Sequence, residues 1–376
     1  MIQFYDVPVK VPAPTIPTTD VASAKNAIHL AFRPFLTLGT ASTLHIHLAD
    51  IAAALAADAN YCLIPAASHA LCASVLADQL GDVHGNEALE HLPTHFRRVM
   101  SELVAAATSL AVMEEDKKYV FYCSVRQFST VWNLKDVIVP LWDGSGPDYV
   151  CAKFDTEEIS LLESKGVFAE VTPTPRNFEE YKAQSMNAQA AFAVTAKYLS
   201  YVHLQPKIPL VCRFFNDRLD RPARQHKYST HQIGLLIAFT HFTNQMQHAG
   251  LFELSTEFRR TLSANLQRST PLEGDRSDVM LVLSGKAVYR PSGQSVFIEI
   301  DSRSIALFTE LAMGGWWRNL GRARELALRL AEMARTVRET PPEPGNARRL
   351  YTSATGISYF IVGQFGNEPQ PGQASG

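Results

Sequence analysis

The chain has 376 residues, is 46% hydrophobic and carries a formal net charge of -2. This length and composition predict a soluble globular protein with a sizeable core, built as one large domain or two ordinary ones. The near-neutral charge excludes a strong overall attraction to nucleic acid, so an RNA-binding role would need a local basic patch. Five scattered cysteines without a C-x-x-C pair speak against a disulfide framework or a zinc ribbon, and they fit a reducing, cytosolic setting.

The segment 1–19 is predicted to be an extended, proline-rich arm. Its prolines are interleaved with valines and an isoleucine, which prevents a helix and favours polyproline-like backbone. Apolar side chains in such an arm gain free energy only on another surface, either on this domain or on a neighbouring copy. We therefore expect arm residues in a subunit interface, namely Phe4, Tyr5, Val7, Pro8, Val9, Val11 and Pro12. The first residues lack a basic segment followed by an apolar run, so no secretory signal is expected.

Residues 20–270 are predicted to form a helix-rich main domain. Apolar residues at helical spacing predict four helices in the first third of the chain, over 20–33, 42–57, 66–80 and 93–110. Four helices in this third indicate a core of packed helices.

The middle of the chain is less regular. Segments 118–132 and 137–142 have the aromatic and β-branched composition of strands, and 144–147 predicts a turn. The spacing then predicts a short helix over 155–164 that ends near Gly166. A long helix is predicted from Asn177 to about Val202.

The best-specified element is a helix from Tyr228 to Gly250. Ser229 and Gln232 form a capping box at its start, and Gly250 stands where a helix normally ends. Its apolar residues lie all around the helix, which predicts that protein surrounds it on every side. A membrane span is rejected because several Gln, Asn and His side chains would be costly in lipid.

The C-terminal third is predicted to combine helices with short strands. A helix is expected over 251–267, a small β-meander over 271–302, and helices with a strand pair over 303–366, ahead of a polar tail over 367–376. Whether the meander protrudes is left open by the sequence. A long helix begins at Trp316 and ends near Arg338. The whole pattern predicts a mainly α (α+β) fold with a small antiparallel β element.

The most metal-like spacing is that of His91 and His95, which stand four residues apart. On a helix, both side chains would face one zinc ion. Pro93 places His91 at the helix entrance, however, and Leu92 stands where a metalloprotease motif has glutamate. A surface or capping role is therefore favoured, and no metal or cofactor is expected.

The chain shows no motif for nucleophilic catalysis or for a phosphate loop. It contains no G-x-S-x-G sequence, and Gly144-Ser145-Gly146 is followed by Pro147 without a lysine. We predict no catalytic residue and expect that the protein is not an enzyme.

Two basic segments are candidates for contact with RNA or with a neighbouring subunit. Segment 213–227 has five cations beside aromatic side chains, which could clamp phosphates or stack on a base. An Arg–Asp network within the chain is favoured over this, because Asp217 and Asp220 stand four residues before arginines. The second basic segment lies on the C-terminal helix, where glutamates reduce its positive charge. The candidate contacts are Arg213, Arg218, Arg221, Arg224, Lys227, Arg318, Arg322 and Arg329.

Trp316 and Trp317, which follow two glycines, are a further candidate for a subunit interface. The alternative is that both belong to the core, where tryptophans are found more often.

The arm 1–19, the helices through Gln267 and the strands over 279–300 together resemble the coat proteins of small icosahedral double-stranded RNA viruses of fungi and plants, the partitivirus-like group. The resemblance covers the whole chain in its arrangement of arm, helices and strands, and it includes no diagnostic motif. It implies a large helical shell-type domain, dimers that assemble into a closed capsid, and N-terminal arms exchanged between subunits. It also implies a location in the virion and host cytoplasm. The implied partners are other copies of the chain, genomic RNA through weak non-specific contacts, and the viral polymerase, with no membrane.

Two alternatives remain open. A helical nucleoprotein would line a groove for single-stranded RNA with the two basic segments, but the net charge speaks against it. A helical metal-dependent enzyme would use His91 and His95.

Overall fold

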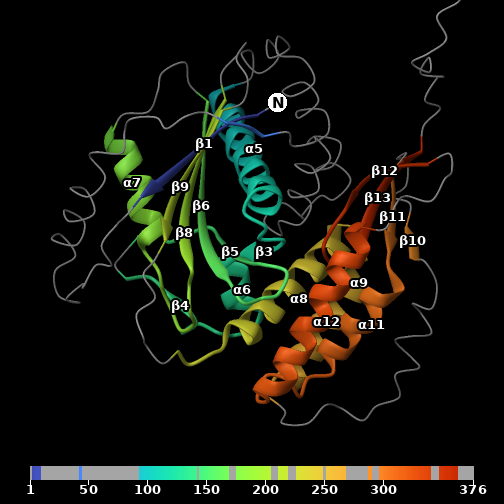
Figure 1. The fold of residues 1–376 in the computed structure, drawn as a ribbon. Coiled ribbons are helices and arrows are strands. Elements are labelled where there is room, and N and C mark those ends of the chain that lie inside the picture. Colours follow the sequence, from blue (N-terminus) through green and yellow to red (C-terminus); the bar gives the residue numbers. More distant parts are fainter. Residues whose placement is uncertain are drawn as a thin grey trace, which may run out of the picture.

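The computed structural model describes residues 2–9, 42–44, 93–141, 144–168, 175–204, 211–218, 226–248, 251–267, 287–289, 296–339 and 347–362. These residues form two halves that pack together (Figure 1). One half is built on a long mixed β-sheet and the other on packed helices beside a smaller sheet.

The first half is a mixed sheet that has seven strands within the described residues, in the order β2-β1-β9-β8-β6-β5-β3. Pairs β1–β9 and β6–β8 are parallel, and the other neighbours are antiparallel. The strands are β1 Ile2–Val9, β2 Ser42–Leu44, β3 Phe121–Ser124, β5 Tyr149–Ala152, β6 Ile159–Phe168, β8 Ala196–Leu204 and β9 Val211–Arg218.

Helix α5 (Thr94–Glu115) lies across one face of this sheet, over β6 and β8. Small side chains make the approach close: Ala105 and Ala107 are fully buried, and a Cβ atom at Gly166 would lie 1.9 Å from the Ser101 carbonyl oxygen. Ser109 of α5 donates a hydrogen bond to Ser200 Oγ on β8 at 2.6 Å. At this crossing the helix and β6 therefore approach through backbone and small side chains, while larger apolar residues of α5 pack in one buried cluster with Leu162, Tyr198 and Phe214.

The opposite face of the sheet is covered in two places. Helix α7 (Pro175–Met186) packs on β6 and β8, with the Tyr181 ring stacked on Tyr201 at 6.1 Å between ring centroids. Helix α8 (Thr230–His248) packs on β3 and β5. Helix α6 (Val125–Val131) directly follows β3, and the short strands β4 (Ile138–Val139) and β7 (Gln189–Ala190) pair with each other.

The second half is organised around α8. It is packed by α9 (Phe252–Asn265) and α12 (Leu320–Glu339), and α11 (Ser302–Ala312) joins those two. Aromatic rings fill the space between these helices: Phe242 and Phe308 stack at 4.0 Å with an interplanar angle of 5°. Beside them lies a sheet of order β10-β11-β13-β12, made of Ala287–Tyr289, Val296–Ile300, Ile357–Val362 and Ala347–Thr352.

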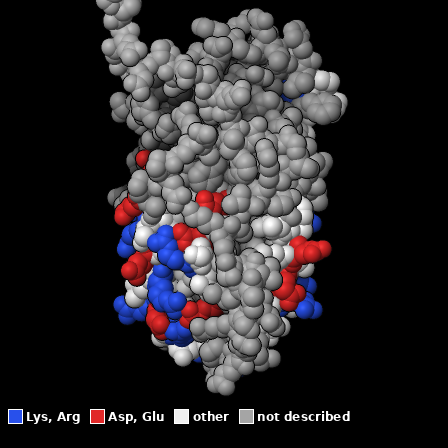
Figure 2. Space-filling view, turned by 90° about the vertical axis from the view of Figure 1, so that its right-hand side faces the viewer, with Lys and Arg blue, Asp and Glu red and all other residues white. Residues whose placement is uncertain are grey.

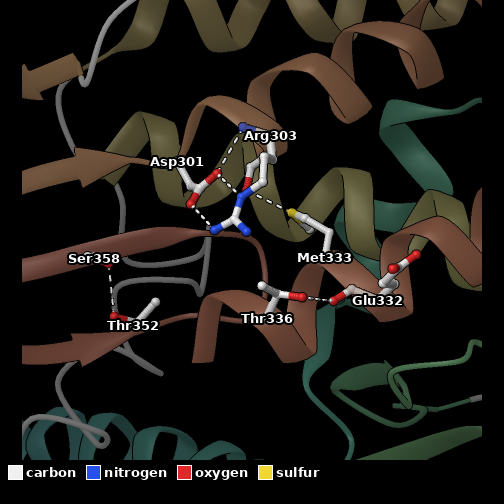
Figure 3. A network of polar contacts seen from close by, with 8 residues as sticks. Asp301, Arg303, Glu332, Met333, Thr336, Thr352 and Ser358 are labelled. Atoms are coloured by element: carbon white, nitrogen blue, oxygen red, sulfur yellow. Dashed lines mark hydrogen bonds and ion pairs between the residues drawn. The ribbon is translucent and has the colours of Figure 1, made fainter. Parts of the chain in front are cut away.

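The small sheet is fixed to the helices by polar contacts (Figure 3). Asp301 caps α11 by accepting a hydrogen bond from the Arg303 N–H at 2.8 Å, and the Arg303 side chain folds back onto the same carboxylate. The Asp301 N–H donates to the Gly356 carbonyl in the β12–β13 turn at 2.9 Å. Gly356 has a φ of +80°, and a Cβ atom there would clash with Ser304. The β12–β13 turn therefore packs directly against the start of α11.

His241 joins the two halves. It lies on α8, and its Nδ1 is 3.0 Å from the carbonyl oxygen of Tyr122, on the last strand of the large sheet. The two rings meet edge-on, with centroids 4.3 Å apart. Burial lowers the pKa of His241 to about 4, although the contact with the Tyr122 backbone opposes the shift. The imidazole is thus neutral at pH 7, and its Nε2 has no hydrogen-bond partner among the described residues.

The prediction for the central helix is confirmed. Helix α8 begins at Thr230, the Gln232 N–H donates to Ser229 Oγ at 3.2 Å, and the Ser229 N–H donates to Gln232 Oε1 at 2.9 Å. These are the reciprocal bonds of a capping box. The predicted helices near 93–110 and 251–267 are also present, as are the helices and the strand pair predicted within 303–366, where the long helix expected from Trp316 begins at Leu320. The predicted helix end at Gly250 lies outside the described residues.

The predicted fold class is wrong. A mainly helical shell-type domain was expected, but the described residues form an α+β fold whose first half is a long mixed sheet. The largest error is the helix predicted from Asn177 to Val202: α7 ends at Met186, and Ala196–Leu204 is strand β8. Every residue of β8 is buried, so its sequence lacks the alternation that marks a half-exposed strand.

The helix predicted over 155–164 is also wrong. A turn occupies residues 154–156, with Thr156 at a φ of +56°, and strand β6 follows. Gly166 is part of that strand, where it allows α5 to approach, and it does not end a helix. The helix predicted from Ser42 begins instead with strand β2, and its remaining residues lie outside the described part of the chain.

The predicted arm and the predicted meander both enter sheets. Ile2–Val9 of the arm is strand β1, between β2 and β9, whereas residues 10–19 lie outside the described part. Of the strands within 271–302 that the structure describes, β11 pairs with β13 of the C-terminal hairpin, and β10 pairs with β11. No helix in the described residues is long and apolar enough to cross a membrane.

Candidate functional site

A cavity of about 530 Å³ lies in the first half of the molecule, beside the large sheet. Its walls come from α6, β4, the loop that precedes β5, and the segment after α7. The lining residues are Ser124, Val125, Arg126, Ser129, Ile138, Val139, Pro140, Gly144, Ser145, Gly146, Pro147, Asp148, Asn187 and Ala188. This volume is in the range of sites that hold a small organic molecule.

The walls are held by buried polar side chains. Asn187 Oδ1 accepts a hydrogen bond from the Leu141 N–H at 2.8 Å, and its Nδ2 donates to the Gly144 and Ser145 carbonyls at 3.3 and 3.2 Å. Lys197, on β8, is buried and donates to the Met186 and Ala188 carbonyls at 3.0 and 2.7 Å. The cavity is therefore preformed, because neither wall depends on a bound molecule for its hydrogen bonds.

Asp148 is the carboxylate in the cavity wall. It precedes β5, and the β5–β6 register, which pairs Tyr149 with Leu162, places it opposite Glu163 on the neighbouring strand. Its Oδ2 accepts a hydrogen bond from the Ser164 N–H at 2.9 Å, and its backbone carbonyl accepts from the Val125 N–H at 2.8 Å. Asp148 is thus fixed to both β6 and α6.

Glu163 and Lys165 complete a charged cluster behind Asp148. The Glu163 side chain is fully buried, and its Oε1 lies 2.5 Å from Lys165 Nζ. Lys165 also lies over the Tyr181 ring at 5.7 Å from the centroid. Two carboxylates therefore share one lysine on the face of the sheet that carries α7.

Burial dominates the protonation of this cluster. It raises the pKa of Glu163 to about 8; the Asp148 charge adds to the shift, and Lys165 opposes it. Burial likewise raises the pKa of Asp148, against the effects of Lys165 and the Ser164 N–H. Burial alone would lower the pKa of Lys165, but the two carboxylates more than offset this and hold it above its ordinary value. A proton on Glu163 thus balances the cluster at neutral pH.

The sequence prediction missed this site. Gly144–Pro147 was interpreted only as a turn, and Asp148 and Glu163 are separated by fourteen intervening positions whose fold was predicted incorrectly. The available signal was the pair of charged residues between the apolar pairs Leu161-Leu162 and Val167-Phe168, where a helix ending near Gly166 was predicted.

The first set of predicted basic residues is only partly described, and its described members do not all lie on one element. Arg213 and Arg218 lie on strand β9, and Arg221 and Arg224 lie outside the described residues. Lys227 is an exposed residue that pairs with Asp136 at 2.6 Å. The predicted pairing of Asp217 with Arg221 assumed helical spacing. Asp217 lies on strand β9, so that assumption fails for Asp217.

The second set is engaged in contacts within the chain. Glu310, on α11, lies between Arg322 and Arg329 of α12; it forms an ion pair with Arg322 and another with Arg329 at 2.8 Å. Arg318 donates to Gln267 Oε1 at 3.1 Å. Figure 2 shows the same pattern on the face it presents, where described cations and carboxylates are interleaved. These arginines stabilise helix packing and leave no basic groove on the described part of that face.

The other predicted site residues are dispersed. Trp316 and Trp317 are buried in the helical core, which is the alternative that the sequence left open, so they offer no surface to a partner. His95 is exposed in the first turn of α5, and His91 lies outside the described residues, as do Val11 and Pro12. The described residues contain no group of three or more His, Cys, Asp or Glu side chains that could hold a metal ion.

Comparison with known proteins yields no relative. No protein-family model matches the chain, and no curated protein or solved structure matches it significantly.

Proposed function

We propose that this protein is a structural protein that assembles with copies of itself into a closed viral shell around a double-stranded RNA genome. The observation that carries the proposal is the position of the N-terminal segment. Strand β1 joins the sheet through a parallel pairing of seven residues with β9, from Gln3–Val211 to Val9–Asp217. A terminal strand held in this way can be supplied by the same chain or by its neighbour, because main-chain pairing is identical in both cases.

The distribution of charge supports a shell over a nucleoprotein. Coating single-stranded RNA requires several free cations along a groove, and its affinity falls steeply with salt. Arg322 is instead paired with Glu310 and Glu325, Arg329 with Glu310, and Lys227 with Asp136. A shell that only encloses its genome needs weak, non-specific contacts, which a near-neutral chain can provide.

The helix-dominated shell domain that the resemblance implied is not part of this proposal, because the described fold is α+β. The proposal rests on the pairing of the N-terminal strand β1 with β9 and on the near-neutral net charge of the chain. A metal-dependent enzyme gains no support from the described residues, since they contain no cluster of metal ligands.

The first test is the mass of the purified full chain by light scattering, with negative-stain microscopy and the ultraviolet absorbance ratio of the same fraction. Closed particles of megadalton mass are expected, and the absorbance ratio would report enclosed nucleic acid. A monodisperse monomer or dimer at every salt concentration and pH tried would refute the proposal.

The role of the arm is tested separately by a cysteine pair across β1 and β9. Gln3→Cys combined with Val211→Cys places two thiols at directly paired positions. We expect disulfide-linked chains from assembled particles on a non-reducing gel, because the arm is exchanged, whereas Gln3→Cys alone gives none. Disulfides found only within single chains, in intact particles, would exclude arm exchange and leave assembly itself standing.

A further inference from the structure

We propose that the outer face of helix α12 binds a second copy of this chain, with the two α12 helices running antiparallel about a two-fold axis at Leu328. The inference does not rest on the proposed shell, because a chain that stops at the dimer would satisfy it equally. It depends on three observations: two exposed leucines on one face of α12, two exposed charges beside them that have no ion-pair partner among the described residues, and the symmetric placement of these charges about Leu328.

Helix α12 carries apolar side chains on two sides. On its outer side Leu320 and Leu328 are 60% and 57% exposed, the highest values among the exposed large apolar side chains of the described residues. Residues eight apart in an α-helix are little more than two turns apart, so both leucines lie on one face. A single exposed leucine is common, whereas two on one helix face leave apolar surface for a partner to bury. The inner side packs into the helical core through Ala323, Leu326, Ala327, Leu330, Met333, Ala334 and Val337.

The charged residues of α12 fall into two groups. Arg322 and Arg329 lie toward α11, where both pair with Glu310. Arg324 and Glu332 are exposed on the outer face, and neither side chain forms an ion pair with another described residue. The inner cations are therefore engaged within the chain, and the outer pair of opposite charges is available to a partner.

The order of the outer residues matches an antiparallel copy of the same helix. Arg324 stands four residues before Leu328, and Glu332 stands four residues after it. In an antiparallel pair centred on Leu328, each Arg324 lies level with Glu332 of the other copy, and the two leucines meet at the axis. Two ion pairs thus form at once, one on each side of the axis. A parallel pair would set arginine against arginine and glutamate against glutamate, which disfavours that orientation.

The next positions outward fit the same pairing. Arg335 stands seven residues after Leu328, level with Gly321 of the other copy. A Cβ atom at Gly321 would meet its nearest atom at 3.5 Å, so the surface there has room for a long side chain. Leu320 falls level with Thr336 of the other copy, whose hydroxyl is bonded within its own helix and whose methyl group can contact the leucine.

The size of this contact predicts a weak dimer. Helix α12 has 20 residues, and two helices that cross touch over only part of their length. Stable interfaces bury roughly 800 Å² on each partner, which is more than one such helix pair provides. We therefore expect a dimer with a Kd in the micromolar range, which weakens as the salt concentration rises because exposed ion pairs are screened.

The first test is a disulfide at the proposed axis. In Leu328→Cys, the thiols of two copies of the full chain meet, so mild oxidation should give a two-chain band on a non-reducing gel. Val99→Cys is the matched control, because Val99 is 50% exposed on α5, away from the axis. It should give about tenfold less of this band, since a disulfide needs Cα atoms within about 7 Å. No two-chain band from Leu328→Cys, or equal yields from both variants, would overturn the proposal.

Charge variants test the register, each made together with Leu328→Cys. Arg324→Glu sets two carboxylates level with each other on each side of the axis, and Glu332→Arg sets two cations there. Either change should lower the two-chain yield about tenfold. An equal mixture of the two variant chains should restore the yield, because every carboxylate then lies level with a cation. Unchanged yields in the separate variants, or no recovery in the mixture, would overturn the antiparallel pairing.

The shell and the α12 dimer can fail separately in these experiments. If the full chain forms no particles, the shell is refuted, while the disulfide in Leu328→Cys still establishes the dimer. If particles form and Leu328→Cys gives no two-chain band, the shell stands and the contact through α12 is excluded. Leu328, Arg324 and Glu332 are all exposed, so these substitutions leave the buried core of the chain unchanged.

Discussion

The two halves of the molecule differ in how closely their elements approach. Where α5 crosses β6, alanines, serines and Gly166 let backbone lie close to backbone, and larger residues such as Leu110 and Met113 fill the cluster around this crossing. Around α8 the contact is made by stacked and edge-on rings, with Phe239, Phe242 and Phe308 all fully buried. The difference teaches where each half is vulnerable: the helical half to loss of volume, and the sheet half to gain of volume.

The largest effect is expected from removing an aromatic ring in the helical half. Phe308→Ala deletes the partner of Phe242 and leaves a cavity, so we expect the free energy of unfolding to fall by about 3–5 kcal/mol. Phe252→Ala is the matched control, because Phe252 is 45% exposed, and its effect should stay within about 0.5 kcal/mol. Urea denaturation of both variants measures the contrast. Equal losses would show that ring packing does not distinguish this half.

The next effect concerns the joint between the halves. The pKa of His241 is about 4 in the folded protein, because the side chain is buried. In the unfolded chain His241 takes up a proton near pH 6.5, whereas in the folded chain it stays neutral down to about pH 4. Its contribution to stability is complete above pH 6.5 and is lost as the pH falls toward 4. The loss amounts to about 3 kcal/mol at 1.36 kcal/mol per pH unit.

Urea denaturation between pH 7 and pH 4 checks this prediction. In His241→Gln, whose side chain cannot take up a proton, the free energy of unfolding should fall less steeply with decreasing pH. The difference in slope should correspond to at most one proton. An identical pH profile in the natural chain and in this variant would show that His241 is not the group responsible.

The smallest of the three effects is expected from adding one methyl group in the sheet half. Gly166→Ala places a Cβ against the Ser101 carbonyl of α5, and we expect a loss of about 1–3 kcal/mol through displacement of the helix. Gly321→Ala, in α12, meets its nearest atom at 3.5 Å and should be neutral or stabilising by up to about 1 kcal/mol. If Gly166→Ala were as stable as the natural chain, α5 would not lie this close to β6.

The same contrast explains which predictions succeeded. In the helical half, Ser229 and Gln232 fix the start of α8 through bonds within four residues, and Gly356 marks the hairpin turn by its positive φ. Such signals are local, and they survive in the sequence. In the sheet half, β8 is buried on both faces, so its sequence resembles that of a buried helix. The helix predicted from Asn177 to Val202 failed for that reason.

The candidate site was beyond sequence reasoning for a related cause. Asp148 and Glu163 become neighbours only through the antiparallel register of β5 and β6, and Asn187 and Lys197 hold the cavity wall from after α7 and from β8. None of these residues belongs to a motif of fixed spacing. Their chemistry depends on burial, which a single sequence shows only once the strands are placed correctly.

The sequence by itself determined the start and the buried character of α8, the C-terminal hairpin and the near-neutral charge. Hydrogen bonds within a few residues and simple composition specify these features. Only the tertiary structure decided that Ile2–Val9 pairs with β9, that β6 and β8 are strands, and that two carboxylates share one lysine beside a cavity. Strand pairing joins residues far apart in the chain, so its energy resides in contacts that no local pattern encodes.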